Sequence, residues 1–345
     1  MRIQELKDEL ERQRPLKWDK KINASEIEMI LENNTIMLHI KALKKEYSIT
    51  QPCHSQIADR LGIPAKYYKK MEDEAPDLLT ENVNTWLKQN GKEFFVRGMG
   101  ESVRALLSDR YRVIDHIDVL YVSLNELQTH ETEIEDCHLS ETEMYVKAKS
   151  NKLKEFVRHR EDIIIGGLLL TNSETGHKAL RLEPRLFRVL CTNGMVIEDL
   201  KTRQIHLGNG DTFFDNQVYL SIRQSIRELF GQFGDIIQNL RDTSEIKVNN
   251  PRTVIRNVVE HYQLSEVQKE NILMAFGSDP EHDKLGIADA VTRAAQKEKR
   301  FEDRIDMEKL GGKVISLPND QFRRFDDNMG SILKSSNFNG ETFSN

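Results

Sequence analysis

Two aliphatic segments separated by a short polar stretch constrain the fold of this chain most strongly. Residues 163–170 and 180–191 have the composition of buried strands, and residues 172–176 between them (Asn-Ser-Glu-Thr-Gly) favour a turn. Strands joined by so short a connection pair antiparallel. Residues 144–149 and 204–207 have the same β-like composition. The sequence therefore predicts four strands of an antiparallel sheet in the middle of the chain.

Helical periodicity follows this β region. Apolar residues recur at helical spacing from Phe213 to about Leu240, and further helices are predicted at residues 251–262, 265–276 and 286–299. The expected fold class is therefore α+β, with an antiparallel sheet in the middle of the chain followed by a long helix and a helical C-terminal part.

Four segments are expected along the chain. Residues 1–34 are predicted to form a charged helical arm, in which a capping box at residues 25–28 begins a short helix. Residues 35–143 are predicted to form an α/β part, and residues 144–317 the core of sheet and helices. Residues 318–345 are rich in Asn, Asp, Ser and Gly and are predicted to be a disordered tail. Within the second segment, strands are expected at residues 35–40 and 94–97, and the acidic residues 115–143 are expected to be partly a helix, at residues 119–127, and partly a solvated loop.

The composition is that of a water-soluble globular protein. Of the 345 residues, 38% are hydrophobic and 31% are charged, and the formal net charge is -6. No apolar run is long enough to span a membrane, and the N-terminus has no apolar signal core. The three cysteines, Cys53, Cys137 and Cys191, lie far apart and are odd in number, which argues against a disulfide framework. A cytoplasmic protein without membrane contact is therefore expected.

Residues 54–71 have the pattern of two short helices joined by a turn. The small, glycine and apolar positions of a helix-turn-helix are occupied by Ala58, Gly62, Ile63, Tyr68 and Met71. In that arrangement the second helix presents Lys66, Lys69 and Lys70 to a DNA groove. Pro64 at its head leaves fewer side chains to read bases. The alternative interpretation is a plain helical hairpin in the core of an ordinary domain.

Basic residues are concentrated in the predicted strands. Residues 146–191 contain ten Lys or Arg and five Asp or Glu, whereas residues 115–143 contain nine acidic residues and no Lys or Arg. Alternation along a strand places Lys147 and Lys149 on one face, and likewise Arg181, Glu183 and Arg185 on one face of another strand. Such a face can follow a phosphate backbone. The alternatives are a solvated outer face and a face neutralised by the acidic residues of the same chain.

A second basic cluster lies upstream, between residues 97 and 112. Its arginines suit phosphate contacts and its tyrosine can stack on a base, but Asp109 and Asp115 can instead neutralise the arginines inside the fold. The candidate nucleic-acid-binding residues are, in all, Arg97, Arg104, Arg110, Tyr111, Arg112, Lys147, Lys149, Lys152, Lys154, Arg158, Arg160, Arg185 and Arg188.

No motif for catalysis or metal binding stands out. The sequence has no Walker loop, HExxH, paired CxxC or GxSxG motif, and Gly98-Met99-Gly100 is a lone GxG typical of a turn. Cys53-His54 and Cys137-His138 are adjacent pairs, and neighbouring residues of a strand point to opposite faces. We therefore expect no catalytic residue, metal or cofactor, and expect Cys191 to be a packing residue.

Three phrases resemble the signature stretches of an uncharacterised family of phage/plasmid-like proteins found on mobile elements. They are VRALLSDRYRVID (103–115), TNSETGHKALRLEPRLFRVLCTNGMV (171–196) and ADAVTRAAQ (288–296), and residues 56–71 also resemble the family's N-terminal part. The resemblance covers about residues 40–299. The resemblance implies that the gene lies near genes for replication, recombination and anti-restriction, and it implies no catalytic role. Separately, the strand–helix order resembles the β-β-β-α core of single-strand annealing recombination proteins.

These observations predict a nucleic-acid-binding accessory protein of a phage or plasmid element, acting on single-stranded DNA in recombination or replication. The alternative is a protein–protein interaction module, such as an inhibitor of a host defence enzyme, in which the acidic residues 115–143 mimic the charge of DNA. The expected partners are nucleic acid, a host defence or replication protein, and a second copy of the chain in a homo-oligomer.

Overall fold

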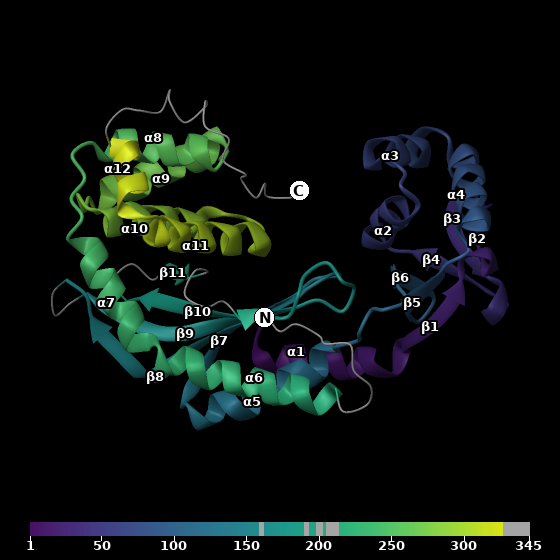
Figure 1. Cartoon of the computed structure of the whole chain (residues 1–345), viewed down its shortest axis with the longest axis horizontal. Helices are drawn as coiled ribbons and strands as arrows, with labels where there is room; N and C mark the ends of the chain where they lie inside the picture. The colour runs from purple at the N-terminus through teal and green to yellow at the C-terminus, as the bar shows by residue number, and fades with distance from the viewer. Residues whose placement is uncertain (159–161, 190–192, 198–202, 205–213, 327–345) are drawn as a thin grey trace.

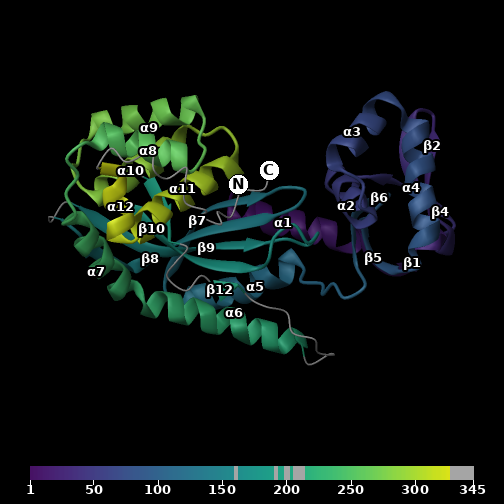
Figure 2. The same cartoon turned by 45° about the horizontal axis from the view of Figure 1, so that its top comes forward.

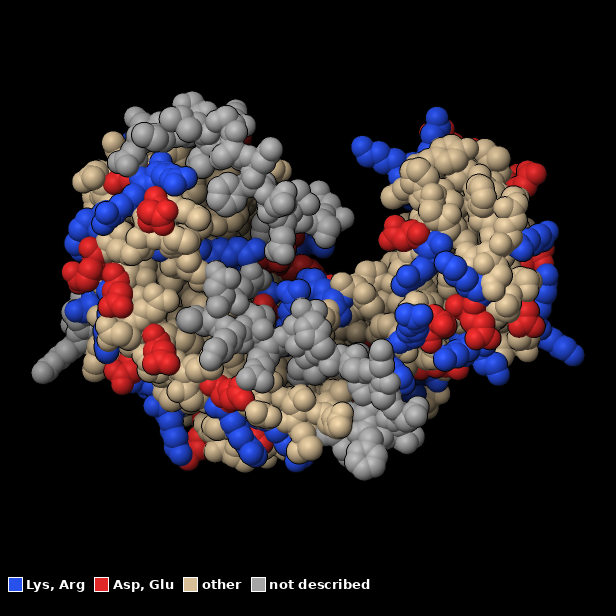
Figure 3. Space-filling view, in the orientation of Figure 1, with Lys and Arg blue, Asp and Glu red and all other residues tan. Residues whose placement is uncertain are grey.

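The computed structural model describes residues 1–158, 162–189, 193–197, 203–204 and 214–326. They form two lobes of unequal size on either side of an open hollow (Figures 1 and 3). Each lobe is built on its own six-stranded sheet. The predicted α+β class is confirmed, and so is the antiparallel sheet followed by helices. No described helix combines the length and apolar character that crossing a bilayer requires.

The smaller, N-terminal lobe contains a sheet with the strand order β1-β5-β6-β4-β3-β2. All of its neighbours pair antiparallel except β4 and β6, which run parallel. Three helices pack on this sheet around a core that includes Ile57, Val83 and Val96. The strands are β1 (Lys17–Asn23), β2 (Ile27–Glu32), β3 (Thr35–Ile40), β4 (Lys45–Ile49), β5 (Glu93–Met99) and β6 (Ser102–Ser108), and the helices are α2 (Gln51–Leu61), α3 (Ala65–Glu74) and α4 (Pro76–Asn90).

The larger lobe contains a sheet with the order β11-β10-β9-β8-β7, in which β12 also pairs with β10. Every pairing is antiparallel. The predicted hairpin of the two aliphatic segments is confirmed, with Leu168 of β9 opposite Pro184 of β10. The strands are β7 (Thr132–Leu139), β8 (Met144–Phe156), β9 (Ile163–Asn172), β10 (Arg181–Arg188), β11 (Asn193–Val196) and β12 (Arg203–Gln204).

Helices cover both faces of this second sheet (Figures 1 and 2). On one face, α1 (Ile3–Gln13), α5 (His116–Thr129) and α6 (Phe214–Gly231) share an apolar cluster with β8, β9 and β10. A helical cap lies on the other face. Gly312 lets the cap approach closely, because a Cβ atom there would lie 1.9 Å from the carbonyl oxygen of Val196. The cap consists of α7 (Phe233–Ser244), α8 (Pro251–His261), α9 (Glu266–Ser278), α10 (Lys284–Ala294), α11 (Phe301–Ser316) and α12 (Asn319–Asp326).

The expected helical arm of residues 1–34 is wrong beyond α1. Residues 25–28 do not begin an α-helix: a single 3-10 turn, Ala24–Glu26, leads into β2, which starts at Ile27 and forms a hairpin with β3. Asn33 and Asn34, both with positive φ, make its two-residue turn, and Ile27 and Met29 are buried at alternate positions. Strand alternation and the Asn33-Asn34 turn therefore determine the local structure here, and the capping pattern does not.

Three further expectations need correction. The acidic residues 115–143 contain strand β7 as well as the predicted helix. The long helix predicted from residue 213 is two helices, α6 and α7, since Gln232 separates them and Phe233 packs over Gly166 of β9. The predicted disordered tail begins with an ordered helix, α12, whose Phe322 and Phe325 are buried. Residues 327–345, 205–207 and Cys191 lie outside the described residues.

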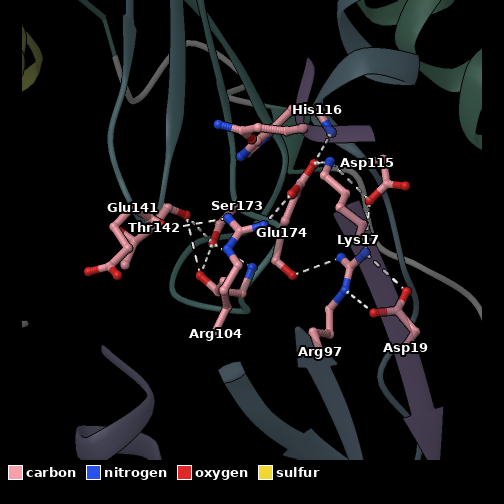
Figure 4. Close-up of polar contacts among 12 residues, drawn as sticks. Lys17, Asp19, Arg97, Arg104, Asp115, His116, Glu141, Thr142, Ser173 and Glu174 are labelled. Carbon is pink, nitrogen blue, oxygen red and sulfur yellow. Dashed lines mark hydrogen bonds and ion pairs between the residues drawn. The ribbon is translucent and has the colours of Figure 1, made fainter. Parts of the chain in front are cut away.

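The two lobes are joined by a buried polar loop between β9 and β10 (Figure 4). The last two residues of β9, Thr171 and Asn172, and the first three of the loop, Ser173 to Thr175, are all buried, and Glu174 is completely so. The Glu174 carboxylate accepts hydrogen bonds from Lys17 Nζ (2.5 Å), Arg104 Nη1 (3.0 Å) and the backbone N–H of His116 (2.7 Å). Lys17 begins β1, Arg104 lies in β6 and His116 is the first residue of α5. One side chain thus holds both sheets and a helix N-terminus together.

The Glu174 carboxylate is ionised in this environment. Burial alone raises its pKa, but attraction from His116, Lys17 and Arg104 outweighs burial and holds the pKa well below its usual value. Burial lowers the pKa of His116 to about 4. Since His116 is uncharged above that pH, Lys17 and Arg104 supply the compensating charge near neutrality.

Replacing Glu174 with Gln is expected to lower the free energy of unfolding by about 3 kcal/mol at neutral pH, because Arg104 would lose its carboxylate partner and Lys17 would keep only Asp115, at 3.8 Å. Urea unfolding measures the loss. Glu101→Gln is the matched control: this glutamate pairs with Lys45 but its side chain is 83% exposed, so its loss should stay below about 1 kcal/mol. Equal losses for the two variants would show that Glu174 does not hold the lobes together.

Stability should fall as the pH drops from about 6.5 towards 4, because the unfolded chain protonates His116 near pH 6.5 and the folded chain only near pH 4. The expected contribution reaches about 3 kcal/mol over this window. His116→Gln should remove that part of the slope. The measurement is urea unfolding of both proteins across the window. Parallel curves would contradict the assignment.

Candidate nucleic-acid interface

The joint between the lobes contains three of the sequence-predicted residues. Arg97 is 4% exposed and donates to Asp19 (2.7 Å) and to Asp115 (2.8 Å). Arg104 is bound to Glu174, and the Tyr111 hydroxyl donates to the Glu174 carbonyl at 3.0 Å. Neutralisation by Asp115, the alternative considered from the sequence, is confirmed for Arg97. These side chains position the lobes and do not present their polar groups to a ligand.

The basic face predicted on the central strands exists. Lys147 lies opposite Leu169 and Leu169 opposite Glu183, and the next row contains Lys149, Gly167 and Arg185. Alternation predicts a shared face within each strand, and the observed register adds that Lys147 and Arg185 lie on the same face of the sheet. Helix α11 covers that face.

Glu308 of α11 occupies the centre of this face. It accepts hydrogen bonds from Lys147 Nζ (2.9 Å) and Arg185 Nε (3.1 Å), and all three side chains are at most 4% exposed. Burial raises the pKa of Glu308, but the positive charges of Arg185 and Lys147 lower it by more than burial raises it. The pKa is therefore below its usual value and the carboxylate is charged. Arg185 also contacts Glu135 of β7. No local signal in the sequence points to Glu308, because it lies over a hundred residues from its partners.

A second buried ionic network joins the ends of β8 and β10 to the helical cap. Arg158 pairs with Asp283 at 2.6 Å and with Glu281 at 3.1 Å. Arg188 pairs with Asp162 at 2.5 Å and contacts Asp289 of α10. Burial raises the pKa of Asp289 to about 6 despite the arginines around it. Both predicted arginines are therefore engaged within the fold.

The remaining predicted residues are divided between paired and open positions. Lys149 pairs with Glu133 at 3.6 Å and Lys152 with Glu131 at 2.6 Å, across β7 and β8. Part of the acidic segment 115–143 thus neutralises the basic strands, as the alternative reading of the sequence proposed. Arg112 is half-buried. Arg110 and Lys154 are exposed, and Arg160 lies outside the described residues.

Helices α2 and α3 form the helix pair that the sequence pattern indicated. Ala58, Ile63, Tyr68 and Met71 are each at most 6% exposed. Gly62 between the helices has a φ of +70°, a left-handed conformation that glycine adopts without strain. His54 of α2 also contacts Tyr68 of α3, with 2.8 Å between Nδ1 and the hydroxyl oxygen. Burial of these positions is common to a helix-turn-helix and to a plain helical hairpin.

The exposed side of α3 distinguishes it from the basic strands. Lys66, Lys69 and Lys70 are exposed, and Tyr67 between them is 46% exposed. Figure 3 shows Lys and Arg side chains projecting from the top of the smaller lobe, where Figure 1 places α3 beside the hollow. Sequence reasoning missed Tyr67. The sequence feature that could have indicated Tyr67 is its position among Lys66, Lys69 and Lys70.

Charge is sorted along α3. Residues 65–70 contain three lysines and no acid, and residues 71–74 contain three acids and no base. Lys69 pairs with Glu72 at 3.1 Å and Lys70 with Glu74 at 3.9 Å, but both lysine side chains are more than half exposed. Exposed pairs contribute about 0–1 kcal/mol, so phosphate can replace them. The first turns of α3 are therefore an accessible basic surface.

Metal binding and nucleophilic cysteine chemistry have little support within the described part of the chain. No group of three or more His, Cys, Asp or Glu side chains there is arranged to hold a metal ion. Cys53 and Cys137 are both buried, and burial raises the pKa of both thiols, that of Cys137 to about 12. Such thiols are poor nucleophiles.

Comparison with known proteins identifies a family. The model of the family described as "Domain of unknown function (DUF932)" matches residues 104–305, which is more than half of the chain. No curated protein and no solved structure matches significantly. The matched region begins at Arg104 and includes His116, Glu174 and most of the helical cap. The chain therefore belongs to the DUF932 family.

Proposed function

We propose that this protein binds nucleic acid through α3, as an accessory protein of a phage or plasmid element in recombination or replication. The observation that carries the proposal is the exposed row of Lys66, Tyr67, Lys69 and Lys70 beside the hollow. Lysines attract the phosphate backbone, and an exposed ring offers a surface on which bases stack. The mobile-element context rests on the resemblance of residues 103–115, 171–196 and 288–296 to phage/plasmid-like proteins.

Single-stranded DNA is the proposed ligand. Tyr67 stands between lysines and can stack only on a base that is not already stacked within a duplex. Pro64 occupies the N-cap position of α3, where a duplex-reading helix would place side chains towards base edges. The candidate residues of the central sheet support the proposal less, because most of them are bound to carboxylates of the same chain.

Charge reversal on α3 tests the proposal. Lys66→Glu with Lys70→Glu should weaken binding of a fluorescent single-stranded oligonucleotide at least about tenfold, because two phosphate contacts are lost. Tyr67→Ala should weaken it about tenfold through lost stacking. Fluorescence anisotropy at two salt concentrations measures both effects, and wild-type affinity should fall as salt rises.

Lys88→Glu with Lys92→Glu is the matched control. Both lysines are exposed in the same lobe and the change in net charge is the same, but they lie at the end of α4 and beyond it. Equal weakening by the two double variants would indicate non-specific attraction. Absence of salt-dependent binding by the wild-type chain would refute the proposed function, and tighter binding to a duplex of equal length would refute the preference for single strands.

A further inference from the structure

Helix α12 is attached to the helical cap by a small and well-defined set of contacts. Only Phe322 and Phe325 are buried, at 1% and 3% exposed, and they belong to the same apolar cluster as Val254 and Val258 of α8. The ring of Phe325 lies 5.6 Å from that of His261, measured between centroids. The outward residues of α12, including Arg323 and Arg324, are exposed.

Polar contacts fix the C-terminal end of α12. The Asp326 carboxylate accepts hydrogen bonds from the backbone N–H groups of Asn249 and Asn250, each at 2.8 Å, immediately before α8. Asp326 thus holds the backbone of the two residues that lead into α8. Asn257 of α8 donates to the Phe325 carbonyl at 2.6 Å. The groove thus recognises a short helix with the pattern Phe-x-x-Phe-Asp.

Lys284 at the other end makes this docking less favourable than the apolar contacts suggest. It is 1% exposed, its Nζ donates to the Leu317 carbonyl at 2.5 Å, and it lies 5.3 Å from the Phe322 ring centroid. No carboxylate among the described residues forms an ion pair with it. Burial lowers its pKa to about 8, so the docked helix covers a lysine that is mostly charged at neutral pH. Undocking α12 returns this charge to water.

We infer that α12 is exchangeable, and that the groove beside α8 also takes the α12 of a second copy of this chain. The contacts that recognise α12 lie within residues 322–326, on α8 and at Lys284. Only Leu317 and Pro318 connect α12 to α11. The groove therefore cannot distinguish its own α12 from that of another copy, and only the tether's effective concentration favours its own. Exchange of an identical element is a low-cost route to a dimer.

Complementation between two full-length variants tests this inference. Phe322→Ala with Phe325→Ala removes the helix contacts but leaves the groove, and Asn257→Trp blocks the groove but leaves the helix. Asn257 is half-exposed, so the larger ring can be accommodated outside the core. Size-exclusion chromatography with light scattering should show a heterodimer after the two are mixed and incubated, and no dimer for either alone.

A mixture that stays monomeric while both variants retain the wild-type circular dichroism spectrum would overturn the inference. If a variant does not fold, the unchanged chain gives a second measurement: its dimer fraction should rise with concentration, and native mass spectrometry of isotopically light and heavy chains should show mixed dimers. Only monomers at the highest soluble concentration would then overturn it. Lys66→Glu with Lys70→Glu, which should weaken nucleic-acid binding, should leave exchange unchanged, and this separates the two proposals.

Discussion

Burial of one carboxylate, that of Glu174, determines how the two lobes meet. Removing an ionised carboxylate from water costs several kcal/mol unless charges and hydrogen-bond donors replace the lost hydration. Here Lys17, Arg104 and the N-terminus of α5 replace it. These groups come from three elements that are each more than fifty residues from Glu174, so the carboxylate can be satisfied only when both lobes are folded and in register. Removing the carboxylate itself takes a counter-charge from both Lys17 and Arg104.

The same principle acts between the second sheet and the helical cap. Lys147 and Arg185 converge on Glu308, and Arg158 and Arg188 converge on Asp162 and two aspartates of the cap region. Apolar packing holds the cap on the sheet, but it does not select one position along a smooth apolar surface. Buried ion pairs with fixed partners do select one position of the cap on the sheet, and this is the role that we assign to these networks.

Buried pairing also explains where the proposed nucleic-acid surface lies. The strands contain most of the basic residues that the sequence pointed to, but a buried guanidinium bound by carboxylates cannot contact phosphate without breaking the fold. The lysines of α3 have neighbours on the same helix, at three or four residues' distance, and stay hydrated. A high local density of positive charge in the sequence is thus a poor guide to an interface unless burial is known.

The sequence by itself determined the elements whose signals are local. The β9–β10 hairpin, the helices after residue 214, the α2–α3 pair with its glycine turn, and the shared face of Lys147 and Lys149 all follow from periodicity, alternation or turn chemistry within a few residues. The capping pattern at residues 25–28 failed because a competing local signal, the Asn33-Asn34 turn, was stronger. The predicted tail failed at α12 because its two phenylalanines gain burial only against α8.

Only the tertiary structure decided which charges are available. Glu174 and Glu308 reach partners more than fifty residues away, and nothing in a linear sequence records which basic residue a distant carboxylate will meet. Electrostatic pairing depends on distance in space and on the exclusion of water, and both are set when the lobes and the cap pack together. For that reason the chain's composition pointed to the strands, whereas its folded surface points to α3.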